Sequence, residues 1–79
     1  MALPSLSDRQ IISVLRKAGF EYAPKRGKGS HSALTKTGAD GITRLVIVPQ
    51  GKDIPRGTLR AILQQANLTP DQFEQLLRQ

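Results

Sequence analysis

The sequence has no cysteine, no tryptophan and only one histidine, His31. The absence of cysteine excludes disulfides and thiolate metal sites. The six acidic residues stand singly along the chain, so His31 has no cluster of carboxylates with which to complete a zinc site. We therefore expect a protein that works without a metal or any other cofactor.

Long apolar stretches and aromatic residues are also scarce. The longest apolar run, Leu45–Val48, is far too short to cross a bilayer. Residues 1–4 lack the basic and apolar regions of a signal peptide, so we expect a cytoplasmic protein without membrane contact. A deep small-molecule pocket is hard to build with so few aromatic residues, and a surface site is expected. The aromatic residues are Phe20, Tyr22 and Phe73.

Acidic residues are few compared with basic ones. Twelve Lys and Arg residues against six Asp and Glu give a net charge of +6 over 79 residues. Four of the basic residues occur without an intervening acid, at Lys25, Arg26, Lys28 and Lys36. This run favours a polyanionic partner, because neutralised phosphates release counterions. A solvated surface that only keeps the protein soluble is the alternative.

A capping pattern and an apolar stripe predict the first helix. Ser7 and Gln10 have the spacing of a capping box, and Leu6 and Ile11 have that of a hydrophobic staple. The apolar positions then recur with helical periodicity, at Ile11, Val14, Leu15 and Ala18. Gly19 is expected to end the helix in a left-handed conformation.

Three short strands are predicted to follow, over residues 20–26, 30–36 and 42–48. Pro24 weakens the first strand, and turn residues 37–41 separate the second from the third. Because each connection is short, an antiparallel meander is the economical arrangement.

Two more helices are expected to complete the chain. Asp53 can cap the second, with Pro55 in its first turn. Its apolar stripe consists of Leu59, Ile62, Leu63 and Ala66. Thr69 and Gln72 repeat the capping box for the third helix. The order α-β-β-β-α-α predicts an α+β fold, a single domain over residues 1–79 with the helices against one face of the sheet.

The stretch Gly-Lys-Gly-Ser-His-Ser, residues 27–32, carries the clearest sign of chemistry. Histidine exchanges protons near neutral pH, and glycine lets a backbone come close to a ligand. A histidine in a glycine-rich, basic setting indicates chemistry at or near a phosphate. The alternative is a surface histidine that only hydrogen-bonds a neighbour.

Several segments together resemble the HicA-type toxins. They are Gly-Ser-His at residues 29–31, Val-Pro at 48–49, Gly-Thr-Leu-Arg-Ala-Ile-Leu at 57–63 with Ala66, and the closing segment 68–73. The resemblance covers nearly the whole chain in the right order, and the string at 57–63 is its most specific part. We expect Gly57 to permit close packing in the first turn of its helix.

The resemblance implies a small toxin that cleaves mRNA without a metal and is silenced by a HicB-type antitoxin. It also implies a fold similar to double-stranded-RNA-binding domains, and we expect the free toxin to be a monomer. The family's catalytic histidine corresponds to His31, and the preceding glycine to Gly29. Many members carry a second histidine shortly after Val-Pro, where this sequence has Gln-Gly-Lys at residues 50–52.

RNA offers the 2′-hydroxyl beside each phosphate as a nucleophile. His31 is then expected to act as general acid or base. The residues expected to bind the phosphate and its developing charge are Lys25, Arg26, Lys28, Gly29 and Ser30. Arg56 and Arg60, one helical turn apart, could extend the basic surface.

Two other functions remain open at this point. One is a non-catalytic RNA-binding module of the same shape. The other is a basic protein that binds an acidic protein. This second function is compatible with the toxin hypothesis, because an antitoxin must cover the same positive surface. The substitution His31→Ala distinguishes the enzyme, which loses cleavage but keeps RNA affinity, from the binding module.

Overall fold

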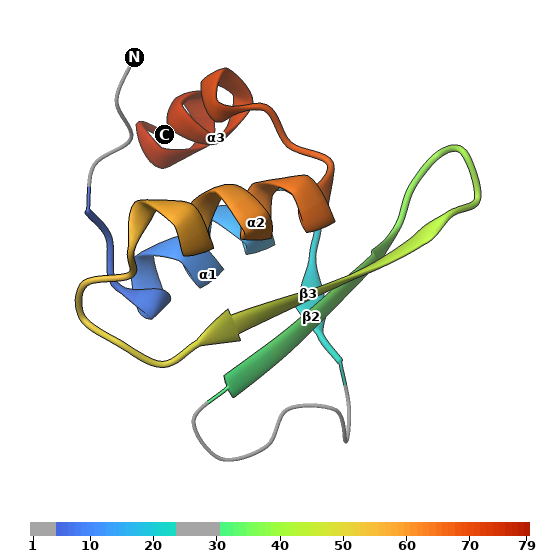
Figure 1. Ribbon diagram of the computed structural model, residues 1–79. Coiled ribbons are helices and arrows are strands. Elements are labelled where there is room, and N and C mark those ends of the chain that lie inside the picture. The colour runs from blue at the N-terminus through green and yellow to red at the C-terminus, as the bar shows by residue number, and fades with distance from the viewer. Residues whose placement is uncertain (1–4, 24–30) are drawn as a thin grey trace.

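The computed structural model describes residues 5–23 and 31–79. Within them the chain forms three helices and one antiparallel sheet of three strands in the order β1-β2-β3. The predicted α+β class, the element order and the helices on one side of the sheet are confirmed (Figure 1). The elements are α1 (Asp8–Lys17), β1 (Glu21–Tyr22), β2 (His31–Thr37), β3 (Thr43–Pro49), α2 (Arg56–Ala66) and α3 (Pro70–Leu77).

Both ends of α1 are closed by local sequence signals. The Ser7 hydroxyl accepts from the Gln10 N–H, and the Gln10 side chain accepts from the Ser7 N–H, which completes the capping box. At the other end Gly19 adopts a φ of 101°. The Phe20 N–H then donates to the Leu15 carbonyl over 3.0 Å, as in a Schellman motif. This bond turns the chain back and brings Phe20 into the core.

The pairing of β2 with β3 forms most of the sheet. It runs from His31 opposite Pro49 at one end to Thr37 opposite Thr43 at the other. Each strand is shifted by one residue toward the C-terminus from its predicted bounds. Proline is tolerated at the end of β3, because β3 is an edge strand and proline has no N–H to pair.

The first strand is much shorter than predicted. We expected it over residues 20–26, but within the described residues only Glu21–Tyr22 pairs with β2. Phe20 is not part of the strand because the Schellman motif directs its side chain into the core. Residues 24–26 of the predicted strand lie outside the described residues.

The predicted cap of α2 is wrong. Pro55 occupies the N-cap position without a side-chain cap, and Asp53 instead accepts a 2.7 Å hydrogen bond from the Ser5 hydroxyl. The cause is Ile54, which is buried and whose N–H donates to the Leu6 carbonyl over 2.8 Å, so the helix begins only after Pro55. The apolar stripe of α2 is confirmed, since the following residues are all buried: Leu59, Ile62, Leu63 and Ala66.

The turn into α3 follows the predicted pattern. Asn67 ends α2 in a left-handed conformation with a φ of 57°. Thr69 and Gln72 form the second capping box, and Pro70 is the first helical residue. Phe73 on α3 is completely buried and belongs to the same core cluster as the buried residues of α1, α2 and the sheet.

The two faces of the sheet differ in their surroundings. Leu34, Val46 and Val48 point toward the helices and are buried in the core. Because side chains alternate along a strand, their neighbours point to the other face. There Leu45 and Ile47 keep 40% and 37% of their surface exposed. Figure 1 shows no helix on this second face in the part of the chain that is described.

Candidate active site

His31 is the first residue of β2 and lies at the end of the sheet where β3 finishes. Its Cα pairs with that of Pro49, and the residue is exposed. The predicted position of the histidine at the start of the second strand is therefore confirmed.

The alternation of β2 also determines which face His31 occupies. Leu34, three residues further on, points to the helices, so the imidazole belongs to the face of the sheet away from the helices. Ser32 is half-buried and stands opposite the core residue Val48. Its hydroxyl is therefore on the other side of the sheet from the imidazole.

The segment after Pro49 is firmly anchored to the residues that precede α1. The Asp8 N–H donates to the Gly51 carbonyl over 2.9 Å, and Ile54 bridges to Leu6. The Ser5 to Asp53 hydrogen bond adds a third connection (2.7 Å). This segment continues directly from the residue opposite His31, so the site lies next to a well-supported part of the fold.

The predicted phosphate-binding residues lie outside the described residues. Their assignment to phosphate binding therefore remains a prediction from sequence. The residues are Lys25, Arg26, Lys28, Gly29 and Ser30. In the chain they lie immediately before His31.

Lys36, the last member of the predicted basic run, does not belong to the site. Its Nζ donates a 2.5 Å hydrogen bond to the Ala18 carbonyl and lies 5.8 Å from the centre of the Phe20 ring. The ammonium group thus satisfies a carbonyl at the end of α1 and packs over an aromatic ring. Its charge serves the fold and is separated from His31 by most of the length of β2.

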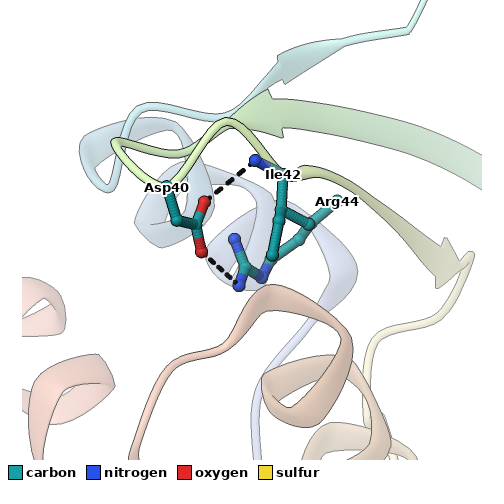
Figure 2. A network of polar contacts seen from close by, with 3 residues as sticks. All are labelled: Asp40, Ile42 and Arg44. Carbon is teal, nitrogen blue, oxygen red and sulfur yellow. Dashed lines mark hydrogen bonds and ion pairs between the residues drawn. The ribbon is translucent and has the colours of Figure 1, made fainter.

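Two further cations make contacts within the fold, one in the hairpin and one between α1 and the C-terminal end of α3. Figure 2 shows Asp40 in the turn between β2 and β3, where it accepts from the Ile42 N–H (3.0 Å) and from Arg44 (3.1 Å). The Arg44 guanidinium, followed by the Ile42 N–H, lowers the pKa of Asp40 from its ordinary value of 3.8. Lys17 donates from α1 to the carbonyls of Leu76 (3.2 Å) and Gln79 (2.7 Å).

Other described cations make no hydrogen bond or ion pair with described residues. They are the side chains of Arg9, Lys52, Arg56 and Arg60. The Arg16 side chain also forms no hydrogen bond or ion pair with the described residues and contacts the Tyr22 ring. Arg9 and Arg16 were not among the site residues predicted from the sequence. Their i, i+7 spacing on the polar side of the predicted helix was the signal that could have identified them.

The described part of the chain offers no group of three or more potential metal-ligating side chains. No helix within residues 5–23 and 31–79 has the length and apolar character needed to span a bilayer. What the site does provide is one exposed imidazole at a sheet end, in a chain with a net charge of +6.

These features define a class of small, basic α+β proteins with a single histidine exposed at the start of the central strand. Residues 9–68 match the family described as the HicA toxin of bacterial toxin-antitoxin systems. The chain therefore belongs to the HicA toxin family and is the toxin of such a pair, for which the family implies a cognate antitoxin. A comparison with curated proteins gives no match.

Proposed function

We propose that this toxin is a metal-independent endoribonuclease that cleaves mRNA. Cleavage inhibits translation and growth until a HicB-type antitoxin neutralises the protein. The observation that carries the proposal is the exposed position of His31, the only histidine of a HicA family member, at the end of β2. The reaction is assigned to a cytoplasmic monomer, and the excess of basic residues suits an RNA substrate.

The RNA supplies the nucleophile of the proposed reaction. His31 acts as general base and takes the proton of a 2′-hydroxyl, whose oxygen attacks the adjacent phosphorus. The bond from phosphorus to the 5′-oxygen breaks, which leaves a 2′,3′-cyclic phosphate and, after protonation, a 5′-hydroxyl. The extra negative charge is stabilised by the residues before His31: Lys25, Arg26, Lys28, Gly29 and Ser30.

The leaving 5′-oxygen needs a proton that His31 cannot supply in the same concerted step. A lysine, a water molecule or a His31 that acts only as acid completes the reaction. Among the described lysines, Lys17 and Lys36 already donate to backbone carbonyls. Lys52 makes no such bond to described residues and follows Pro49, the residue opposite His31. It is the described lysine that is available for this role.

The substitution His31→Ala tests the proposal. We expect cleavage of a messenger RNA to fall by about 10²- to 10⁴-fold, the usual contribution of general acid–base catalysis, while RNA affinity is retained. Induced expression of the variant should no longer arrest growth. Thr37→Ala, at the other end of β2, is the matched control and should leave cleavage unchanged. The measurements are cleavage rates on purified RNA and growth after induction.

Analysis of the product ends tests the mechanism separately. Cyclic phosphate and 5′-hydroxyl ends are expected, whereas 3′-hydroxyl ends would identify water as the nucleophile and contradict the mechanism. If the wild type and His31→Ala both bind RNA and neither cleaves it, the protein is instead an RNA-binding module without catalysis.

A further inference from the structure

A second basic surface lies on the molecule between α1 and β1, apart from the residues assigned to catalysis. It is an open hollow of about 640 Å³ lined by Arg9, Ile12, Ser13, Arg16, Lys17 and Tyr22. Three of these residues are cationic and none is acidic. The hollow therefore combines positive charge, a hydroxyl group and one aromatic ring.

The charges of this hollow are available to a ligand to different degrees. The Arg9 side chain makes no hydrogen bond or ion pair with the described residues. The Arg16 guanidinium lies 5.6 Å from the centre of the Tyr22 ring and forms no ion pair. Lys17 is held by the carbonyls at the end of α3. Arg9 and Arg16, two turns apart on α1, are thus the pair that can contact two phosphates.

Tyr22 distinguishes this hollow from a merely basic surface. The other two aromatic residues, Phe20 and Phe73, are buried, whereas Tyr22 keeps 54% of its surface exposed. Its pairing with Leu34 in β2 places the ring on the helix side of the sheet, where Arg16 lies. An exposed aromatic ring beside a guanidinium is a platform on which a nucleobase can stack.

The hollow and the candidate active site lie on opposite faces of the sheet, because Tyr22 is on the helix side and His31 is on the other. An RNA strand that contacts both passes around the sheet edge formed by β1. Leu34, the partner of Tyr22, is three residues from His31 along β2, a distance of about 10 Å at the usual strand rise. The chain leaves β1 at Ala23, whose N–H donates to the Ala33 carbonyl over 2.9 Å. The sequence from there to His31 carries three further basic residues, at positions 25, 26 and 28.

We propose that the hollow between α1 and β1 binds the single-stranded RNA segment next to the scissile phosphate. Arg9 and Arg16 contact two phosphates of this segment, and Tyr22 stacks with one of its bases. This inference rests on the proposed ribonuclease function and adds to it a substrate-binding surface. An acidic peptide would also use the arginines, but it would leave the exposed face of Tyr22 without a planar partner.

RNA binding can be measured separately from cleavage in the His31→Ala background. The probe is a fluorescein-labelled single-stranded RNA of mixed sequence, and its binding is followed by fluorescence anisotropy over a series of salt concentrations. The test variant combines Arg9→Ala with Arg16→Ala. The matched control combines Arg56→Ala with Arg60→Ala, which removes the same charge from exposed positions of α2. Thermal unfolding confirms that each variant is folded.

We expect the α1 pair to weaken RNA binding by at least about tenfold, as for lost hydrogen bonds to charged groups. The slope of log K against log salt should fall by about 1.4, or 0.7 for each lost phosphate contact on a single strand. The α2 pair should change affinity by no more than about threefold, since its charges act only through screened solvent. Tyr22→Ala should weaken binding by about five- to 160-fold, whereas Tyr22→Phe should retain it.

Equal losses in the two arginine pairs would overturn the proposal, because the basic surface would then act diffusely. Unchanged affinity in Tyr22→Ala would exclude the stacking contact. If the α1 pair lost antitoxin binding but kept RNA affinity, the hollow would be a protein-binding surface. None of these results depends on cleavage, so failure of the ribonuclease proposal itself would be recognised by intact RNA in the wild-type reaction.

Discussion

Single residues of the same type have different roles in this protein because their neighbours differ. Lys36 and Lys17 donate to backbone carbonyls at helix ends, and Arg44 pairs with Asp40. Arg9 makes no such contact among the described residues and remains available for a ligand. A net charge of +6 therefore overstates the basic surface that a partner can use. Only the cationic side chains that make no hydrogen bond or ion pair within the fold are available to bind a partner.

The hairpin turn should lose stability in acid through Asp40. Its pKa is lowered in the folded state, so its contribution is fully present above the unfolded pKa and is lost as the pH falls through the folded pKa. Asp40→Asn should therefore be less stable than the wild type at neutral pH. The difference should shrink as the pH falls below the ordinary pKa of 3.8 and vanish below the lowered pKa of the folded state. Urea unfolding across this pH range provides the measurement. A difference that persists in strong acid would show that the charge of Asp40 is not its cause.

The close-packing role that we expected for Gly57 is wrong. A Cβ built at this position meets no atom within 4 Å, and the backbone is not left-handed. Gly57→Ala should therefore stabilise the protein by about 0.5 kcal/mol, because alanine loses less conformational entropy in a helix. Gly19→Ala is the matched control with the opposite sign, since Gly19 has a φ of +101° and its Cβ would lie 3.2 Å from Lys36. Thermal unfolding distinguishes the two, and destabilisation by Gly57→Ala would contradict the prediction.

At the scale of elements, the chain repeats two ways of ending a helix. Capping boxes begin α1 and α3, and left-handed residues end α1 and α2, at Gly19 and Asn67. In both endings the next residue, Phe20 or Leu68, donates its N–H back to the preceding helix and packs on the core. These short signals set the direction of each connection, and α2 begins without a side-chain cap because Ile54 is held by Leu6.

The edge strand β3 is protected by a side chain from α2. The Ile47 N–H points away from β2 and donates to Oε1 of Gln65 over 3.2 Å. Gln65→Ala should cost about 0.5 kcal/mol and accelerate hydrogen exchange of the Ile47 amide, because that N–H becomes open to solvent. Gln64→Ala removes an adjacent exposed glutamine whose side chain makes no hydrogen bond with the described residues, and it should change neither quantity. Equal exchange rates in the two variants would exclude the protection.

For the whole molecule, α3 is part of the core although the family match ends before it. The match covers residues 9–68, whereas α3 spans Pro70–Leu77. Phe73 is fully buried, and Lys17 of α1 binds the carbonyls of Leu76 and Gln79. The third helix therefore closes the helical layer above α1 and α2 (Figure 1). In a chain of 79 residues Phe73 is one of only two aromatic side chains in the core cluster, the other being Phe20.

Loss of this anchor should destabilise the entire fold. Phe73→Ala is expected to cost about 3–5 kcal/mol, a large fraction of the stability of a small domain. Phe73→Leu keeps most of the apolar volume and should lose much less. Urea unfolding followed by circular dichroism gives both values. If Phe73→Ala lost only the signal of α3 and the remainder unfolded as before, α3 would be an independent appendage.

The sequence by itself determined the order of the elements, both ends of α1, the start of α3, the buried stripe of α2 and the family. These properties follow from spacings of three to seven residues and from local capping, which require no distant partner. Tertiary structure decided the short β1, the role of Asp53, the engagement of Lys36, the face that His31 occupies and the hollow beside α1. Each of these depends on a partner far along the chain, such as Ser5 for Asp53 or Ala18 for Lys36. Only packing brings those partners together.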